Sequence, residues 1–189
     1  VILTGTDPSS RKGGIGFAMA GYIEALERRD IPYRSIPTYH PDDFRGRWLL
    51  FVLALPRILA DIRSARRKSK GVVVYSHAGA GVSLVREGVV LAFSKLFGAS
   101  TVVQIHAPQT EKYLTNRLKK VLFKIALSGA DRIAVLTPWW QNRFIQAGIT
   151  QPVYVISNPL PPSLLKQAIK KRKKNRLPGT TKNGNILSL

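Results

Sequence analysis

Residues 71–108 read GVVVYSHAGAGVSLVREGVVLAFSKLFGASTVVQIHAP. Two segments of this stretch, Gly71–Ser76 and Ser100–Ile105, are short, rich in β-branched residues and uncharged, which is typical of strands covered on both faces. The segment between them, Val82–Phe97, has the length of a crossover helix. A strand, a helix and a second strand in this order form a right-handed unit with two parallel strands. The stretch therefore predicts a parallel sheet.

The same alternation extends through most of the chain. Further strands are predicted at Val1–Gly5, Tyr33–Pro37, Ile133–Leu136 and Val153–Ile156, and further helices at Ile15–Arg29, Trp48–Lys68, Tyr113–Ser128 and Trp139–Ala147. The last helix is preceded by Thr137, a good capping residue, and by Pro138, which suits the first helical position. The predicted fold class is α/β: a Rossmann-like open parallel sheet with helices on both faces.

The composition limits the classes of function. The chain has 189 residues, of which 44% are hydrophobic, so it can bury a sizeable core. The absence of Cys excludes a disulfide scaffold, a thiolate zinc site and catalysis by a Cys nucleophile. The 30 Lys and Arg residues against 10 Asp and Glu give a net charge of +20. This charge predicts an anionic partner: nucleic acid, a membrane surface or a phosphate-bearing ligand.

The most apolar window, from Trp48 to Pro56, reads WLLFVLALP and has Arg on either side. It is about half of the roughly 18 residues that a transmembrane helix needs. We therefore expect either a buried helical turn or a segment at a membrane interface.

In open parallel sheets, ligands bind beyond the carboxyl ends of the strands. The loop after the first strand contains Asp7, Arg11, Lys12, Gly13 and Gly14, and it leads into a helix. The two glycines allow the backbone to approach a ligand, and a helix N-terminus beside two basic residues favours an anion. The loop has neither the dinucleotide-binding fingerprint nor a P-loop motif, so a plain tight turn is the alternative.

Two of the three His residues also fall at carboxyl ends of predicted strands. His77 follows the third strand and His106 follows the fourth. The alternative to a site is a pair of structural imidazoles. No metal is expected, because the nearby carboxylates, Asp7, Glu87 and Glu111, do not have the spacing of metal ligands.

The order and spacing of these motifs resemble the family 4 glycosyltransferases of the GT-B fold. The resemblance rests on the glycine pair, the two His residues, the segment ADRIAVLTP at Ala130–Pro138 and the segment VISNPL at Val155–Leu160. It implies that residues 1–162 are the N-terminal, acceptor-binding domain, one half of a GT-B fold. Residues 163–184 would then be a basic interdomain helix and linker, and residues 185–189 the start of a truncated C-terminal, donor-binding domain.

The resemblance also implies roles for individual residues. His106 matches the histidine that contacts the transferred sugar at the reaction centre, and it is the candidate catalytic residue. Gly13 and Gly14, with Arg11 and Lys12 beside them, are candidates for binding the phosphates of the donor. His77 and Asp7 are candidates for binding the acceptor.

The reaction implied is transfer of a sugar, with retention of configuration, from a nucleotide-diphosphate sugar to a glycan or lipid-linked acceptor. The donor is a substrate, and neither a further cofactor nor a metal is implied. The paired-Glu motif of the family belongs to the C-terminal domain and is absent from this chain, so we expect this fragment to be inactive without that partner domain.

Two predicted helices combine apolar with basic residues, a pattern that suits the surface of an anionic bilayer. From this pattern we expect a peripheral location on the cytoplasmic face of the membrane. The alternative is a basic, solvated helix face. The candidate membrane-contact residues are Arg57, Arg63, Arg66, Arg67, Lys68, Arg117, Lys119, Lys120 and Lys124.

Two other classes of protein remain open. A basic Rossmann-like module without catalysis could bind nucleic acid through the tail Lys166–Lys182, although that run lacks interleaved aromatic residues and the chain has no recognised nucleic-acid-binding motif. A Rossmann-like domain that binds a small molecule without catalysis is the third possibility.

Overall fold

The computed structural model describes residues 1–10, 13–42, 47–106 and 108–159. Within them six parallel strands form one open sheet, so the α/β prediction is confirmed. Each strand lies within two residues of its predicted bounds. In spatial order the strands are β2 (Arg34–Tyr39), β1 (Ile2–Thr6), β3 (Val73–Ala78), β4 (Ser100–Ile105), β5 (Arg132–Val135) and β6 (Val153–Val155).

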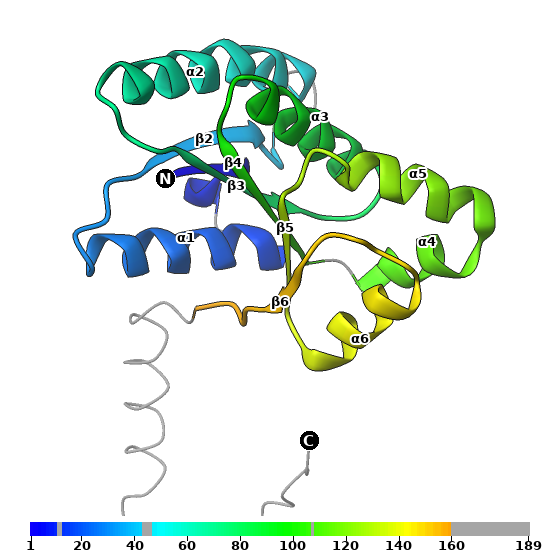
Figure 1. Ribbon diagram of the computed structural model, residues 1–189. Helices are drawn as coiled ribbons and strands as arrows, with labels where there is room; N and C mark the ends of the chain where they lie inside the picture. Colours follow the sequence, from blue (N-terminus) through cyan, green and yellow to red (C-terminus); the bar gives the residue numbers. More distant parts are fainter. Residues whose placement is uncertain (11–12, 43–46, 107, 160–189) are drawn as a thin grey trace, which may run out of the picture. The chain divides into compact units, whose positions relative to one another are not determined.

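Helices cover both faces of this sheet (Figure 1). One face is covered by α1 (Gly13–Glu27), whose buried side chains include Ala18 and Met19. The opposite face carries α2 (Arg47–Arg67), α3 (Val82–Leu96) and α5 (Arg117–Leu127). The short helix α4 (Glu111–Thr115) precedes α5, and α6 (Pro138–Gln146) precedes β6.

The chain changes direction at β1. It leaves β1 through α1 to reach β2, then returns through α2 to β3 on the other side of β1. The carboxyl ends of β1 and β3 therefore flank the switch point of the sheet, where ligands of open α/β folds bind.

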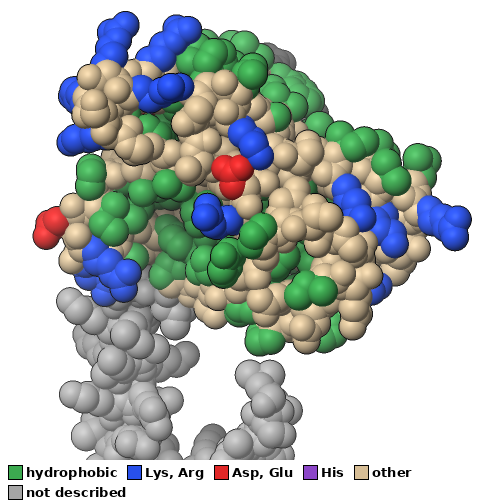
Figure 2. Space-filling view, in the orientation of Figure 1, with side chains coloured by type: hydrophobic (Ala, Val, Ile, Leu, Met, Phe, Trp, Pro, Cys, Tyr) green, Lys and Arg blue, Asp and Glu red, His purple; other side chains and the backbone are tan. Residues whose placement is uncertain are grey.

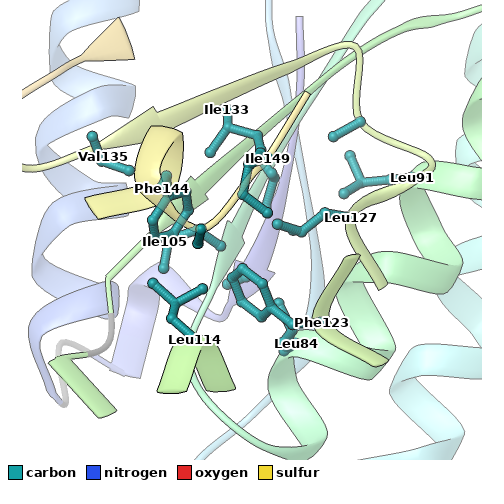
Figure 3. Packing of buried hydrophobic residues seen from close by; sticks show 14 residues of the cluster. Leu84, Leu91, Ile105, Leu114, Phe123, Leu127, Ile133, Val135, Phe144 and Ile149 are labelled. Carbon is teal, nitrogen blue, oxygen red and sulfur yellow. The ribbon is translucent and has the colours of Figure 1, made fainter. Parts of the chain in front are cut away.

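The largest core cluster joins α3, α4, α5 and α6 to β3, β4 and β5 (Figure 3). At its centre the rings of Phe123 and Phe144 meet edge to face, with centroids 5.6 Å apart. A second cluster packs Ile58 and Ile62 of α2 and Val90 of α3 against β1, β2 and β3. Both clusters lie on the same side of the sheet and hold the helices of that side in place.

One prediction about helices was wrong, and one of two alternatives is excluded. The single helix predicted at Tyr113–Ser128 is interrupted at Asn116, which has extended backbone angles (φ −100°, ψ 129°). The Asn116 side chain caps α5 by accepting a hydrogen bond from the Lys119 backbone N–H at 3.0 Å. For the window from Trp48 to Pro56 the buried turn is excluded, because Trp48, Leu49 and Val52 are more than half exposed, and the interfacial segment stays a prediction.

Among the described residues, none of the helices combines the length and the apolar character needed to cross a membrane. The predicted linker at 163–184 and the predicted strand at 185–189 lie outside the described residues.

Candidate functional site

The two candidate His residues meet at the carboxyl edge of the sheet. Adjacent parallel strands bring them together, because His77 of β3 is in register with Gln104 of β4 and His106 comes two residues later. The Nδ1 atom of His77 lies 2.9 Å from the Nε2 atom of His106, which is a hydrogen-bond distance. Sequence analysis placed both residues at this edge but did not predict that they bond to one another.

His77 is buried in an aromatic cluster on the α1 side of the sheet. Its ring centroid lies 5.0 Å from those of Tyr22 on α1 and Tyr75 on β3. Gly5 of β1 allows this close packing, because a Cβ atom there would lie 3.1 Å from the Cβ of His77 and 3.0 Å from its carbonyl oxygen. The backbone φ of Gly5 is +141°, which also favours glycine.

The hydrogen bonds of His77 indicate its tautomer. Its Nε2 atom is buried and has no hydrogen-bond partner among the described residues. If His77 accepted the bond from His106, this Nε2 would carry an unpaired buried N–H, which is rarer than an unpaired acceptor. We therefore assign Nδ1–H of His77 as the donor and Nε2 of His106 as the acceptor. His106 then carries its own proton on Nδ1.

Both imidazoles are neutral at physiological pH. Burial lowers the pKa of His106 to about 4. Burial first, and then the neighbouring His106, lowers the pKa of His77 well below its ordinary value. A neutral imidazole with Nδ1–H can donate a hydrogen bond to a hydroxyl group, and it keeps this proton without adding a positive charge.

A second polar cluster surrounds Glu87 of α3. It lies on the face of the sheet that carries α3, opposite the face on which His77 packs. The carboxylate accepts hydrogen bonds from Thr4 at 3.0 Å, from Ser76 at 3.2 Å and from Thr38. The guanidinium Nε of Arg86 lies 3.3 Å from Glu87 Oε1. Both charged residues are buried. The cluster thus ties α3 to the three strands β1, β2 and β3 next to the switch point.

Burial raises the pKa of Glu87, and its hydroxyl partners and Arg86 act in the opposite direction. Sequence analysis named Glu87 only as a carboxylate without metal-ligand spacing, and it missed this network. The signal for it was an Arg-Glu pair inside a mostly apolar helix, together with Thr and Ser residues in predicted strands.

A pocket of about 400 Å³ lies at the switch point. The ends of β1 and β2 contribute Thr6 and Tyr39, and the residues after β3 contribute Gly79 and Ala80. The guanidinium of Arg86 lies over the ring of Tyr39, with its Cζ 5.0 Å from the ring centroid. The hydrogen bonds from Arg86 to Thr38 and Glu87 both come from its Nε atom, at 3.3 Å.

The glycine pair begins α1, and Ile15 in the first turn of this helix lines the pocket. Gly13 has a φ of +69°, and neither Gly13 nor Gly14 has another described atom within 4 Å of where a Cβ would lie. Side chains at these two positions would therefore meet no other described part of the chain. Arg11 and Lys12 lie outside the described residues.

Asp7 has a local structural contact. Its carboxylate Oδ1 accepts a hydrogen bond from the Ser9 backbone N–H at 2.8 Å, and its own backbone N–H donates to the Tyr39 carbonyl at 2.8 Å. These bonds fix the turn after β1 and link it to the end of β2.

The segment after β6 is held against the sheet. Gln104 of β4 donates hydrogen bonds from Nε2 to the Ile156 carbonyl at 3.0 Å and to Asn158 Oδ1 at 3.3 Å. Tyr75 donates to Gln104 Oε1 at 3.0 Å. A Cβ at Gly21 of α1 would lie 2.3 Å from the Pro159 carbonyl oxygen, so the segment also packs closely on α1.

The described residues contain no group of three or more His, Asp or Glu side chains that could hold a metal ion. The candidate membrane-contact residues are exposed on α2, just after it, and on α5, except Lys120, which is half-buried. Arg66 also donates a hydrogen bond to the Phe97 carbonyl at 3.1 Å.

No family model and no curated protein match this chain. The fold and the site define it as an α/β domain with a pocket and a neutral His pair at the carboxyl edge of its sheet.

Proposed function

We propose that the chain is the acceptor-binding half of a retaining glycosyltransferase that moves a sugar from a nucleotide-diphosphate donor to an acceptor. The observation that carries the proposal is the neutral His77–His106 pair at the same sheet edge as the pocket. The helix N-terminus at Gly13 supports it, because phosphates bind at such positions.

His106 is the residue that contacts the transferred sugar in this proposal. Its Nδ1–H donates to a hydroxyl of the sugar, and its Nε2 is held by His77, so the ring cannot turn away. Because the ring stays neutral, it orients the sugar without repelling the positive charge that develops on it in an oxocarbenium-like transition state.

The acceptor, a glycan or a lipid-linked precursor, occupies the pocket at the switch point. Tyr39 and Trp48 offer aromatic surface there, and Arg86 offers a positive charge held by Glu87. Binding of the nucleotide and closure over the cleft belong to the second domain of such an enzyme, which excludes water from the reaction.

We also propose a peripheral location on the cytoplasmic face of the membrane. The exposed basic residues of α2 and α5 support it, since each Lys or Arg near an anionic surface contributes about 1 kcal/mol. Equal binding of the protein to neutral and to anionic liposomes would contradict a role for these charges.

The reaction is tested with the full-length protein and a panel of nucleotide-diphosphate sugars. His106→Ala should abolish transfer while the thermal unfolding curve still shows a folded protein, and His40→Ala is the matched control, because His40 lies outside the His pair. Retained turnover in His106→Ala would remove this residue from the site. Tight, steeply salt-dependent binding of DNA or RNA without any transfer would favour a nucleic-acid-binding module instead.

A further inference from the structure

Five of the six exposed residues of α3 are apolar, and the sixth, Lys95, pairs with Asp131. The apolar ones form a stripe and recur at intervals of three or four residues: Val82, Val85, Val89, Ala92 and Leu96. The other side of the same helix is buried in the core. A helix on the surface of a globular protein normally presents polar side chains to water. This helix is therefore apolar on the side where folding provides no cover.

The neighbouring helices extend this apolar surface. α3 lies between α2 and α5, and its Gly88 packs so closely on α5 that a Cβ would lie 2.5 Å from the Ala126 carbonyl oxygen. Figure 2 shows hydrophobic side chains along the side of the molecule formed by these helices. We define the apolar patch by the large side chains that are 40% to 79% exposed on the three helices: Trp48, Leu49, Val52, Leu53, Val82, Val85, Val89, Leu96, Leu118, Val121, Leu122 and Ile125.

On α5 the apolar residues occupy the centre of the outward face. Phe123 and Leu127 point into the core, while Leu118, Val121 and Ile125 lie on the opposite side of the helix. The basic residues of α5 flank this row. The helix thus has two apolar faces. One packs in the core, and the other is exposed on the surface of the domain.

The exposed charges on the described parts of these helices are basic, and the acidic Asp131 beside α3 pairs with Lys95. Of the acidic residues on α2, α3 and α5, Glu87 is buried and Asp61 pairs with Arg34. The exposed basic residues on α2 and α5 include Arg57, Arg117 and Lys119. An apolar surface with a cationic border is complementary to an anionic bilayer, in which apolar side chains enter the acyl boundary and cations meet lipid phosphates.

The pocket opens at the border of the apolar patch. Trp48 and Val82 belong to the patch and also line the pocket, at the first turns of α2 and α3. A ligand with a polar head and an apolar chain could therefore place its head beside Arg86 while its chain continues onto the patch. A wholly water-soluble glycan would gain nothing from this continuity.

We infer that the apolar patch docks the domain onto an anionic bilayer and holds the mouth of the pocket at the lipid surface, so that the pocket receives the polar head of a membrane-anchored acceptor. The docking does not depend on glycosyl transfer. That the bound lipid is a sugar acceptor rests on the proposed function. The apolar side chains carry the binding here, and the basic residues add to it.

Vesicle flotation tests the docking. The patch variant combines Val85→Ser, Val89→Ser and Leu122→Ser, and the matched control is Phe17→Ser, which changes an exposed apolar residue of α1 on the opposite face of the sheet. With vesicles of phosphatidylcholine and phosphatidylglycerol, the parent and the control should float. The patch variant should bind on the order of 100-fold more weakly, with an unchanged melting temperature. Equal binding of the patch variant and the parent would overturn the inference.

The salt dependence separates the apolar contribution from the ionic one. Raised salt should weaken the binding of the parent without abolishing it, because apolar burial is not screened. Complete loss of binding at raised salt would overturn the inference. A parent protein that ignores vesicles but forms dimers that the patch variant cannot form would overturn it too, by showing a protein interface.

Fluorescence tests the position of the pocket mouth. Brominated phosphatidylcholine in the vesicles should quench part of the Trp emission, and Trp48→Phe should remove that part. Quenching that is absent, or unchanged in Trp48→Phe, would overturn the placement of the mouth at the bilayer. Neither assay contains a nucleotide sugar, so their failure leaves the proposed function to be judged by His106→Ala.

Discussion

The buried His pair should make the protein unstable in mild acid. The unfolded chain binds a proton at His106 near the ordinary pKa of 6.5, but the folded protein does so only at about 4. Between these values the unfolded state binds more protons, so stability is lost as the pH falls. For His106 alone the free energy of unfolding should drop by about 2.5 kcal/mol from about pH 7.5 to about pH 4.5. His77, whose pKa is lowered further by burial, adds to the loss.

Urea unfolding at the two pH values measures this effect, and His106→Asn isolates it. The variant loses some stability at every pH because His77 loses its hydrogen-bond partner, but its unfolding free energy should depend less on pH by about 2.5 kcal/mol. The raised pKa of Glu87 acts with the opposite sign, since its proton stays bound in the folded state as the pH rises. That contribution is common to both proteins and cancels in the comparison.

Thr137→Ala provides the control for destabilisation as such. The Thr137 side chain caps α6 by accepting a hydrogen bond from the Trp140 backbone N–H, and its loss should cost about 1 kcal/mol at both pH values. A wild-type protein whose stability is the same at both pH values would refute the reasoning. So would a His106→Asn variant that keeps the full pH dependence of the wild type.

Two further substitutions test the packing around the site, both by the midpoint of urea unfolding. Glu87→Ala leaves the buried Arg86 without its counter-ion and should cost about 3–5 kcal/mol, and a loss below about 1 kcal/mol would contradict the network. Gly88→Ala places a Cβ 2.5 Å from the Ala126 carbonyl oxygen and should cost about 1–3 kcal/mol by pushing α3 from α5, whereas an unchanged midpoint would show that this contact is loose.

The sheet could be predicted because its four central strands, β1, β3, β4 and β5, are largely buried. Such strands are continuous β-branched runs bounded by turn residues, and these runs located every strand of the described sheet to within two residues. The break at Asn116 was missed because Asn is tolerated inside a helix, and only the hydrogen bond to the Lys119 backbone N–H identifies it as a cap.

The candidate site could be predicted in position but not in its contacts. The topology of a parallel sheet places His77 and His106 at one edge, as expected. Their hydrogen bond depends on the register of β3 against β4, and the Glu87 network depends on how α3 rotates against the sheet. Neither is encoded locally. The exposed stripe of α3 was not predicted either, because apolar residues of a helix are expected to face the core, whereas Val85 and Val89 lie on the surface.

Sugar transfer by the full-length protein decides whether this edge of the sheet is a glycosyl-transfer site. The assay follows a labelled sugar from nucleotide-diphosphate donors into the acceptors of a membrane lipid extract, with wild type, His106→Ala and His40→Ala side by side. The site described here predicts a labelled, lipid-extractable product for the wild type and for His40→Ala, and none for His106→Ala. Transfer that persists in His106→Ala, or no transfer by the wild type from any donor, would contradict it.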